Sequence, residues 1–448
     1  PLYAQALLGL GVDQFRDEIE KASHPGDGHW DDLVAYIQAH HADIELIRKA
    51  SRRPGFGYVL DFQWDEWMHR LQPEVAEQMR AREQNETLYS LPIPAVGLLR
   101  QIARLLAADA HLAALNGQPD RAYDNIVAMF AIAEHVRESP TLINGLVCVR
   151  IHTLAYRLVS ELLQEYPEVL TNEQLRDLAH RIGRIDGRNL ITFEGERATF
   201  YDFVQRYYSD DGHGDGYLTS AGFRFFQHMP TAGWLRHDGA GDFAGYLRLA
   251  AQPGASRFTM ASRSEIVAMY TRMVDAIERH YPTPLRFQPA LPADVTMANW
   301  SEFDRHYYMP LTVVLPAVGS IRIDIERYGA TQDVTLIGIA LELYRREHNR
   351  WPDALNELAP KYMRELPVDR ISGGPLCYRV VDDQPTIYSV GVDLDDDGGR
   401  MVHIGGDKPS QRTAERRNER AAQWLTPEQR ETQTPPDGDW LLWPIPSE

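Results

Sequence analysis

The stretch 103-ARLLAADAHLAALNGQPDRAYDNIVAMFAIAEHV-136 decides the fold of the first half of this chain. Its alanine- and leucine-rich first part stops at Asn116–Gly117, a pair that is typical of the end of a helix. Pro119 follows, and proline suits the first turn of a new helix because that position needs no backbone N–H. Small residues let two such helices approach closely, and the stretch carries them at Ala110, Ala114 and Ala122. The stretch therefore predicts a helical hairpin.

Helical signals also surround this hairpin. Residues 30–51 have apolar side chains at helical spacing, a further helix is expected from about Thr141, and 171-TNEQ-174 is a capping box that starts another. The hairpin resembles those of tetratricopeptide proteins, although no second clean copy follows at that period. We therefore expect a helical domain over residues 1–190, followed by a mixed, mainly helical or irregular region over residues 191–325.

The hydrophobic period changes near Pro375. Before it, 334-VTLIGIALELYRREH-348 has a helical stripe, whereas 375-PLCYRVV-381 and 386-TIYSV-390 alternate and predict a β-hairpin. A third strand is expected at 401-MVHI-404. The expected fold class is therefore α+β, with a mainly α-helical N-terminal region followed, over residues 326–405, by a helix packed on a small antiparallel sheet.

The remaining residues, 406–448, form a C-terminal tail. Within it, 426-TPEQ-429 predicts a short helix, and 434-TPPDGDWLLWPIP-446 has too many prolines and glycines for regular structure. Each large apolar side chain of the segment 440–443 costs about 1.5–3 kcal/mol to leave in water. We therefore expect the tail to dock on the body of the protein or on a partner.

Composition excludes some classes of function. The formal net charge of −18 argues against binding to nucleic acid or to anionic lipid, which attract basic surfaces. The two cysteines, Cys148 and Cys377, make neither a metal-ligand cluster nor a disulfide framework, and Cys148 is expected in the core. No run approaches the roughly 18 apolar residues of a membrane span. The chain starts at Pro1 without a methionine, so a removed signal or anchor segment stays open as a membrane tether.

Motifs of familiar hydrolases are missing from the sequence: there is no G-x-S-x-G, H-E-x-x-H, P-loop or G-x-G-x-x-G. The candidate catalytic acids are Glu194, Glu196 and Asp202, which lie among aromatic residues. Paired carboxylates are what glycoside hydrolysis uses. The alternative is that they are surface acids paired with arginines.

The stretch 386-TIYSVGVDLDDDGG-399 is a candidate metal site. Asp393, Asp395 and Asp397 alternate before a glycine, as in the opening of an EF-hand loop, but position twelve is Ile404 and a strand precedes the loop. Two like charges about 4 Å apart repel by roughly 1 kcal/mol in water and by about 4 kcal/mol at an effective dielectric near 20. A cation would relieve this repulsion, and a loop splayed into solvent is the alternative. Zinc is disfavoured because His403 is the only nitrogen ligand nearby.

Residues 334–399 resemble the periplasmic part of the major pseudopilin of type II secretion. The matching features, in order, are 344-YRREH-348, 350-RWP-352, 355-LNEL-358, 366-LPVD-369, 374-GP-375, 378-YR-379 and 388-YSVGVD-393. The resemblance implies a calcium-binding closing loop in which Asp393 is the loop aspartate, the Val390 carbonyl contributes and Asp407 closes the shell. The hydrophobic assembly helix of pseudopilins is missing from this sequence, and Arg370 and Ile371 replace the usual proline and tryptophan, so a pilus-building role is not carried over.

Most of residues 40–405 is also similar to a broad group of uncharacterised, secreted or membrane-tethered proteins of planctomycete-type bacteria. The stretches that match are 48-RKASRRP-54, 99-LRQIARLLAADAHLAALNGQPDRAYDN-125, 140-PTLINGLV-147 and the C-terminal module. This resemblance implies a periplasmic or extracellular location, and it implies no particular activity.

Three functions are therefore open. The first is a non-catalytic extracytoplasmic scaffold or interaction protein with a structural Ca²⁺ in its C-terminal module. The second is a hydrolase that uses paired carboxylates in a cleft between domains. The third is a subunit of a secretion or envelope assembly. The first and third require protein partners.

Overall fold

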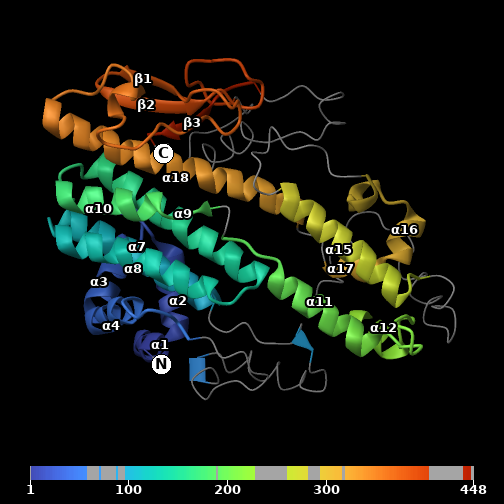
Figure 1. Ribbon diagram of the computed structural model, residues 1–448. Helices are drawn as coiled ribbons and strands as arrows, with labels where there is room; N and C mark the ends of the chain where they lie inside the picture. The colour runs from blue at the N-terminus through green and yellow to red at the C-terminus, as the bar shows by residue number, and fades with distance from the viewer. Residues whose placement is uncertain are drawn as a thin grey trace.

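The computed structural model describes residues 2–57, 70–71, 87–88, 96–187, 190–227, 260–280, 293–314, 318–402 and 437–444. Helices dominate these residues, and one small three-stranded antiparallel sheet lies at the top of the molecule (Figure 1). The α+β class is therefore confirmed. The helix expected at 426–429 lies outside the described residues, as do His403, Ile404 and Asp407.

The N-terminal helices form a layered body. Its described members are α1 (Leu2–Leu10), α2 (Val12–Lys21), α3 (Trp30–Ala39), α4 (His41–Ser51), α7 (Val96–Leu115), α8 (Pro119–Arg137), α9 (Leu142–Glu165) and α10 (Asn172–Gly183). The predicted hairpin is α7–α8: Gly117 turns the chain at a φ of 60°, and Pro119 opens α8. The capping box before α10 is also confirmed. The Gln174 N–H donates to the Thr171 hydroxyl oxygen, and the Thr171 N–H donates to the Gln174 side-chain oxygen.

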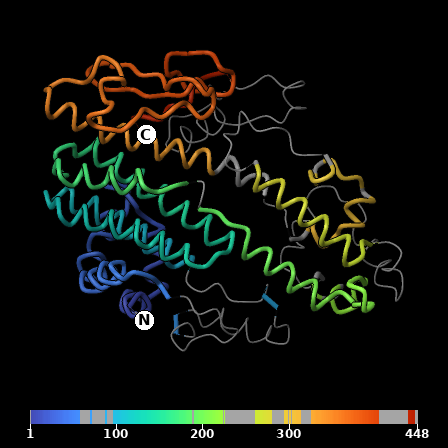
Figure 2. Tube along the Cα trace, viewed as in Figure 1, coloured from blue at the N-terminus to red at the C-terminus, as the bar shows by residue number. Residues whose placement is uncertain are grey.

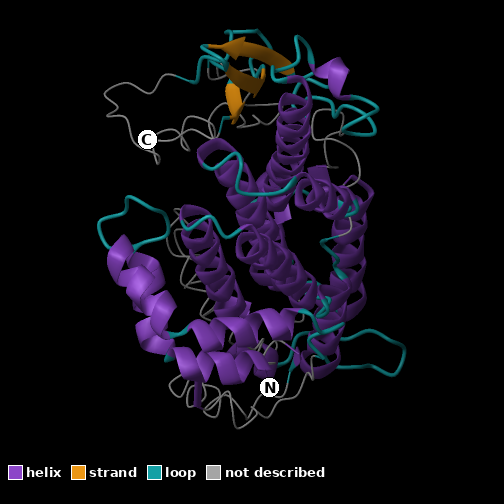
Figure 3. Ribbon diagram, turned by 90° about the vertical axis from the view of Figure 1, so that its left-hand side faces the viewer, coloured by secondary structure: helices purple, strands orange, loops and turns teal. Residues whose placement is uncertain are grey.

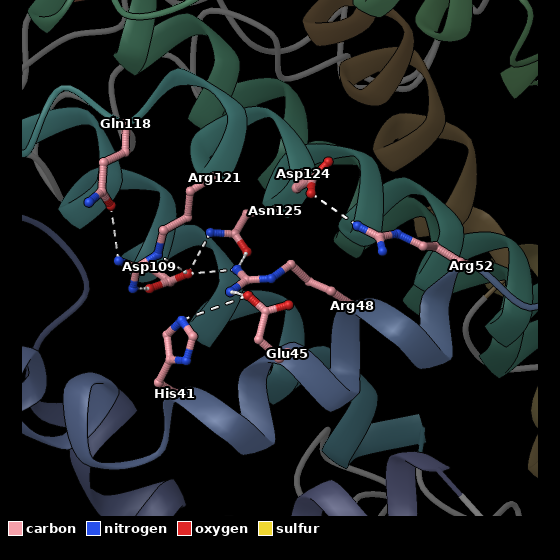
Figure 4. A network of polar contacts seen from close by, with 9 residues as sticks. All are labelled: His41, Glu45, Arg48, Arg52, Asp109, Gln118, Arg121, Asp124 and Asn125. Carbon is pink, nitrogen blue, oxygen red and sulfur yellow. Dashed lines mark hydrogen bonds and ion pairs between the residues drawn. The ribbon is translucent and has the colours of Figure 1, made fainter.

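A buried polar network joins α4, α7 and α8 (Figure 4). Asp109 of α7 is fully buried and accepts hydrogen bonds from Arg48 Nη1 at 2.9 Å and from Asn125 Nδ2 at 2.7 Å. Arg121 of α8 also donates to this carboxylate. Arg48 is 3% exposed, so its charge is compensated inside the protein and not by water. The stretches 48–54 and 99–125 thus meet in this network.

The long helix α18 (Val318–His348) connects the helical body to the sheet. It packs on α9 and α10 on one side and on β3 on the other, so the sheet lies above it in Figure 1. Figure 3 shows the strands above the helices. The helix expected at 334–348 therefore exists, but it begins at Val318. Its buried residues, such as Ile337, belong to the same hydrophobic cluster as Leu7 of α1 and Ile387 of the sheet. The body and the C-terminal module share one core.

The sheet has the order β1 (Cys377–Val381), β2 (Gln384–Ser389) and β3 (Trp440–Trp443). The predicted hairpin is confirmed: β1 and β2 pair antiparallel around Asp382 and Asp383, whose positive φ angles of 50° and 59° suit a tight hairpin turn.

The expected third strand at 401–404 is not seen in its two described residues, Met401 and Val402, and the expectation that 434–446 has no regular structure is wrong. Met401 makes only an isolated bridge to Asp439, and β3 is the tail segment Trp440–Trp443. The prolines and the glycine flank these four residues and do not interrupt them. Pairing with β2 buries Leu442 and Trp443, and this burial favours the strand.

A second lobe is inserted between α10 and α18 and lies to one side of the body (Figure 2). Its described helices are α11 (Glu194–Tyr207), α12 (Ser220–Gln227), α15 (Arg263–His280), α16 (Glu302–Tyr307) and α17 (Met309–Val314), with short 3₁₀ turns at Ala293–Val295 and Met297–Asn299. It has its own hydrophobic cluster, in which the rings of Phe200 and Tyr270 stack at 3.9 Å. A third 3₁₀ turn, Leu355–Leu358, follows α18 in the C-terminal module.

Helix α9 is long and apolar enough to cross a membrane, judged by length and composition alone. This helix was not expected as a candidate membrane span from the sequence. In the fold it packs against α7, α8 and α18, and more than half of its apolar window is buried inside the protein. This is the environment of a central core helix, so α9 by itself is weak evidence for a membrane span.

Candidate metal centre

The aspartate loop leaves β2 and folds back on itself. Positive φ angles at Gly391, Leu394, Gly398 and Gly399 turn the chain four times within a few residues. Three of these are glycines, which adopt such angles without steric cost. The turns gather alternate carboxylates on one side of the loop.

Four carboxylates meet at this loop. One oxygen from each of Asp393, Asp395, Asp397 and Asp437 lies within 4.8 Å of the others. The first three are the metal ligands expected from the sequence. Asp437 was not expected: it belongs to the segment before β3 and reaches the loop because β3 pairs with β2.

Backbone hydrogen bonds fasten the loop to that segment. The N–H of Gly438 donates to Asp393 Oδ2 at 2.8 Å across 45 residues of sequence. The N–H of Gly399 donates to Asp439 Oδ2 at 2.6 Å, and the N–H of Asp439 donates to the Arg400 carbonyl at 2.7 Å. A Cβ at Gly438 would lie 2.6 Å from the Val402 nitrogen, so the two segments touch. The four carboxylates are therefore held by two segments that fix each other.

Several carboxylate oxygens in this region are buried without a hydrogen-bond partner among the described residues: Asp393 Oδ1, Asp397 Oδ2 and Asp439 Oδ1. Burial raises the pKa of Asp439 to about 6, and the charges of Asp396 and Asp397 add to the effect. Burial also raises the pKa of Asp393, with a further contribution from Asp395. The raised pKa values mean that the ionised forms of Asp393 and Asp439 are unfavourable in these surroundings when no cation compensates them.

Only one basic side chain is seen to pair with the four acids in the described part of the chain. Arg400 donates to Asp397 and lies 3.4 Å from Asp437. Asp396 is outside the cluster and accepts instead from the Tyr388 hydroxyl and the Gly398 N–H, both at 2.9 Å. The cluster thus combines four acids with one partial counter-charge, and its ligand atoms are all hard oxygens, which suit Ca²⁺ better than zinc.

The other two expected ligands are Val390 and Asp407. Val390 lies directly after β2 at the entrance to the loop, three positions before Asp393. Asp407 lies outside the described residues. Sequence reasoning missed Asp437, and the signal for it was the acidic 437-DGD-439 immediately before an apolar segment.

The three candidate catalytic acids lie on α11. The two that are partly buried, Glu196 and Asp202, each bind a group on another part of the chain. Glu196 Oε1 accepts from the N–H of Leu142 at 2.7 Å, at the start of α9, and burial raises its pKa. Asp202 pairs with Arg206 at 2.7 Å and accepts from the N–H of Leu88. Glu194 is exposed at the first turn of the helix. These contacts connect α11 to its neighbours, as expected for structural acids.

Comparison of the chain with protein-family models, with curated proteins and with solved structures finds no match.

Proposed function

We propose that this protein is a non-catalytic extracytoplasmic scaffold or interaction protein whose C-terminal module holds a structural calcium ion. The observation that carries the proposal is the convergence of Asp393, Asp395, Asp397 and Asp437, with buried oxygens that lack a partner among the described residues. Calcium accepts six to eight oxygen ligands in flexible geometries. The four carboxylates would supply part of such a shell, and backbone carbonyls or waters the rest.

The ion would hold the tail on the body. Three of the proposed ligands come from the loop after β2, and Asp437 comes from the segment that leads into β3. Trp443 of β3 belongs to the core shared with α18. A cation between the two segments would therefore stabilise the sheet and its attachment to the long helix, which is a structural and not a catalytic role.

The proposed location follows from the same site. Calcium sites of modest affinity, with dissociation constants of roughly 10⁻⁴ to 10⁻³ M, are typical of extracellular modules, where calcium is abundant. The pseudopilin-like order of motifs and the planctomycete-type resemblance support a periplasmic or extracellular, secreted or membrane-tethered protein. The tetratricopeptide-like pairing of α7 and α8 supports contacts with protein partners, including those of an envelope assembly.

Calcium titration tests the proposal. The full chain is stripped of metal, titrated by calorimetry and melted in calcium and in EDTA, alongside the double variant Asp393→Ala/Asp395→Ala. We expect binding in the millimolar range or tighter, and a melting temperature that rises with calcium. The double variant should lose both effects.

A matched control is Asp382→Asn, which removes an acid from the β1–β2 turn of the same sheet. Asn tolerates the left-handed backbone of that position, so this variant should bind calcium like the wild type. If the wild type shows neither binding nor destabilisation by EDTA, the loop is only a solvated hairpin end and the calcium proposal is wrong.

A further inference from the structure

A second group of metal-ligating side chains lies inside the helical body, on elements that take no part in the aspartate cluster. Cys148 and His152 are one turn apart on α9, and Glu134 of α8 faces them. One donor atom from each of these three residues lies within 4.8 Å of the other two. Residues at positions i and i+4 share a helix face, so α9 presents the thiol and the imidazole side by side.

His152 is completely buried, and one of its ring nitrogens is unused. Nε2 has no hydrogen-bond partner among the described residues and lies 3.9 Å from Glu134 Oε1. Nδ1 lies 3.4 Å from the Tyr328 hydroxyl and 3.9 Å from Cys148 Sγ. The Tyr328 hydroxyl in turn shares a hydrogen bond of 2.9 Å with Tyr156. The imidazole is therefore oriented from one side and left without a partner on the other.

Burial also keeps this histidine neutral, since it lowers the pKa of His152 to about 3. A neutral imidazole is the form that binds metals.

Glu134 turns one carboxylate oxygen toward His152 because Arg137 holds the other. Arg137 donates to Glu134 Oε2 from Nε at 3.1 Å and from Nη2 at 2.7 Å. This leaves Oε1 as the atom nearest to the histidine. Glu134 is also half exposed, which distinguishes it from the two buried residues of the group.

A cavity of about 770 Å³ opens beside the group, between α8, α9 and the end of α10. His152 and Glu134 both line it. The exposed residues around it include four basic ones, Arg137, His180, Arg181 and Arg184, and the acid Asp186. The buried imidazole therefore lies beside a space that solvent and small solutes can enter, and none of its own surface is exposed.

We propose that Cys148, His152 and Glu134 bind a zinc ion, with the open coordination position directed into this cavity. Thiolate, imidazole and carboxylate are the three protein ligands that zinc takes, and three of them with one open position is the pattern of a zinc site that holds water or a ligand. In tetrahedral coordination such ligand atoms lie about 3.3–3.6 Å apart, given zinc–ligand bonds of roughly 2.0–2.3 Å. In the protein, His152 Nε2 lies 3.9 Å from Glu134 Oε1, which is a few tenths of an ångström longer. Cys148 Sγ lies 3.9 Å from the other ring nitrogen, Nδ1, so binding at Nε2 requires the Cys148 side chain to move toward that atom.

Zinc binding has a defined proton balance. Cys148 is a thiol in the metal-free protein, because burial raises its pKa. On binding, the Sγ–H bond breaks, the sulfur lone pair forms the Zn–S bond, and one proton leaves to the buffer. His152 would bind through Nε2, while Nδ1–H donates to the Tyr328 hydroxyl and fixes the ring, as outer-shell partners do in metal sites. This inference does not depend on the calcium proposal.

The test uses the full chain, stripped of metal and kept in excess calcium so that the aspartate cluster is saturated. Zinc is titrated by calorimetry in two buffers of different ionisation enthalpy, and Co²⁺ is used as a spectroscopic probe. We expect one zinc per chain, the release of about one proton, and a thiolate-to-cobalt charge-transfer band. Cys148→Ser should abolish the band, and His152→Ala should weaken zinc binding by a factor of ten or more.

Two further variants guard against loss of the fold. Cys377→Ser changes the other, partly buried cysteine and should leave the band and the affinity as in the wild type. Glu134→Gln changes a half-exposed residue, so the helices should melt as before while zinc affinity falls about tenfold or more.

A competing group consists of His24, His111 and Glu165, in which His24 Nε2 lies 2.9 Å from Glu165 Oε1. Zinc binding that survives Cys148→Ser and Glu134→Gln but is lost in His24→Ala assigns the metal to that group and overturns the proposal. The proposal is also overturned if the wild type shows no thiolate-to-cobalt band.

Discussion

The indole of Trp443 lies directly against Gly338. A Cβ at position 338 would lie 2.5 Å from the indole ring. The last strand of the sheet therefore packs against α18 at a glycine, where there is no side chain to hold it away. Gly338 is in the middle of a 31-residue helix, where glycine is unfavourable by about 1 kcal/mol relative to alanine. The close approach of the tryptophan explains why glycine is nevertheless accommodated there.

The substitution Gly338→Ala should therefore destabilise the protein. The gain in helix propensity is about 1 kcal/mol, whereas overpacking against a buried ring costs about 1–3 kcal/mol. We expect a lower free energy of unfolding in urea, with a change in tryptophan fluorescence as β3 shifts. The control is Gly183→Ala at the end of α10, where an added Cβ meets nothing within 4 Å and stability should be unchanged or slightly higher. Equal behaviour of the two variants would contradict the contact.

The substitution Asp109→Ala should be among the most damaging in the helical body. It leaves Arg48 and Arg121 without their shared carboxylate, and Arg48 is almost fully buried. Breaking a buried ion pair by removing one partner costs about 3–5 kcal/mol when a buried charge is left uncompensated. Arg48 keeps its pair with the half-exposed Glu45 at 2.8 Å, so we expect a loss toward the lower end of this range.

Denaturant unfolding measures this cost. The control is Asp124→Ala, which removes the surface pair of Asp124 with Arg52 at 3.0 Å. Both of its side chains are exposed, so the change should be within about 0.5 kcal/mol. A loss for Asp109→Ala no larger than that of the control would mean that water enters the network.

The substitution Glu196→Gln tests the role of this buried acid. Burial raises the pKa of Glu196 in the folded state, so the folded protein holds this proton more tightly than the unfolded chain. The stability of the wild type should therefore fall as pH rises through the interval between the unfolded and the folded pKa. Glutamine keeps an acceptor for the Leu142 N–H and has no charge to bury.

We therefore expect Glu196→Gln to be more stable than the wild type at neutral pH, with a difference that shrinks below about pH 4. Melting temperatures of both proteins across this pH range check the prediction. A variant that is less stable than the wild type at pH 7 would contradict the prediction and would show that the fold needs the carboxylate in its charged form.

The substitution Asp437→Asn should weaken calcium binding while leaving the strand hydrogen bonds in place. Asp437 contributes its side chain to the cluster, whereas the neighbouring backbone groups of Gly438 and Asp439 fasten the two segments. Loss of one charged ligand should raise the dissociation constant for calcium, measured by calorimetry, by about tenfold. In EDTA the variant should melt at or above the wild-type temperature, because one repelling charge is removed. A calcium affinity equal to that of the wild type would show that Asp437 is not a ligand and that the ion does not connect the loop to the tail.

The sequence alone determined the elements that depend on near neighbours. The α7–α8 hairpin follows from Gly117 and Pro119, the start of α10 follows from a capping box, and the β1–β2 hairpin follows from alternation around Asp382–Asp383. Caps, turns and periodicity act over a few residues, so they can be recognised without knowing the rest of the fold. For the same reason Asp393, Asp395 and Asp397 could be grouped within one loop from the sequence.

Only the tertiary structure decided which distant segments meet. The strand that pairs with the free edge of β2 is Trp440–Trp443, because that apolar segment buries Trp443 against Gly338 while pairing with β2. This pairing brings Asp437 to the loop. The packing of α8 on α9 likewise brings Glu134 to Cys148 and His152, whose four-residue spacing was visible in the sequence but whose third partner was not. Such contacts are selected by the burial of side chains from many elements at once, and this is a property of the packed core and not of any single stretch.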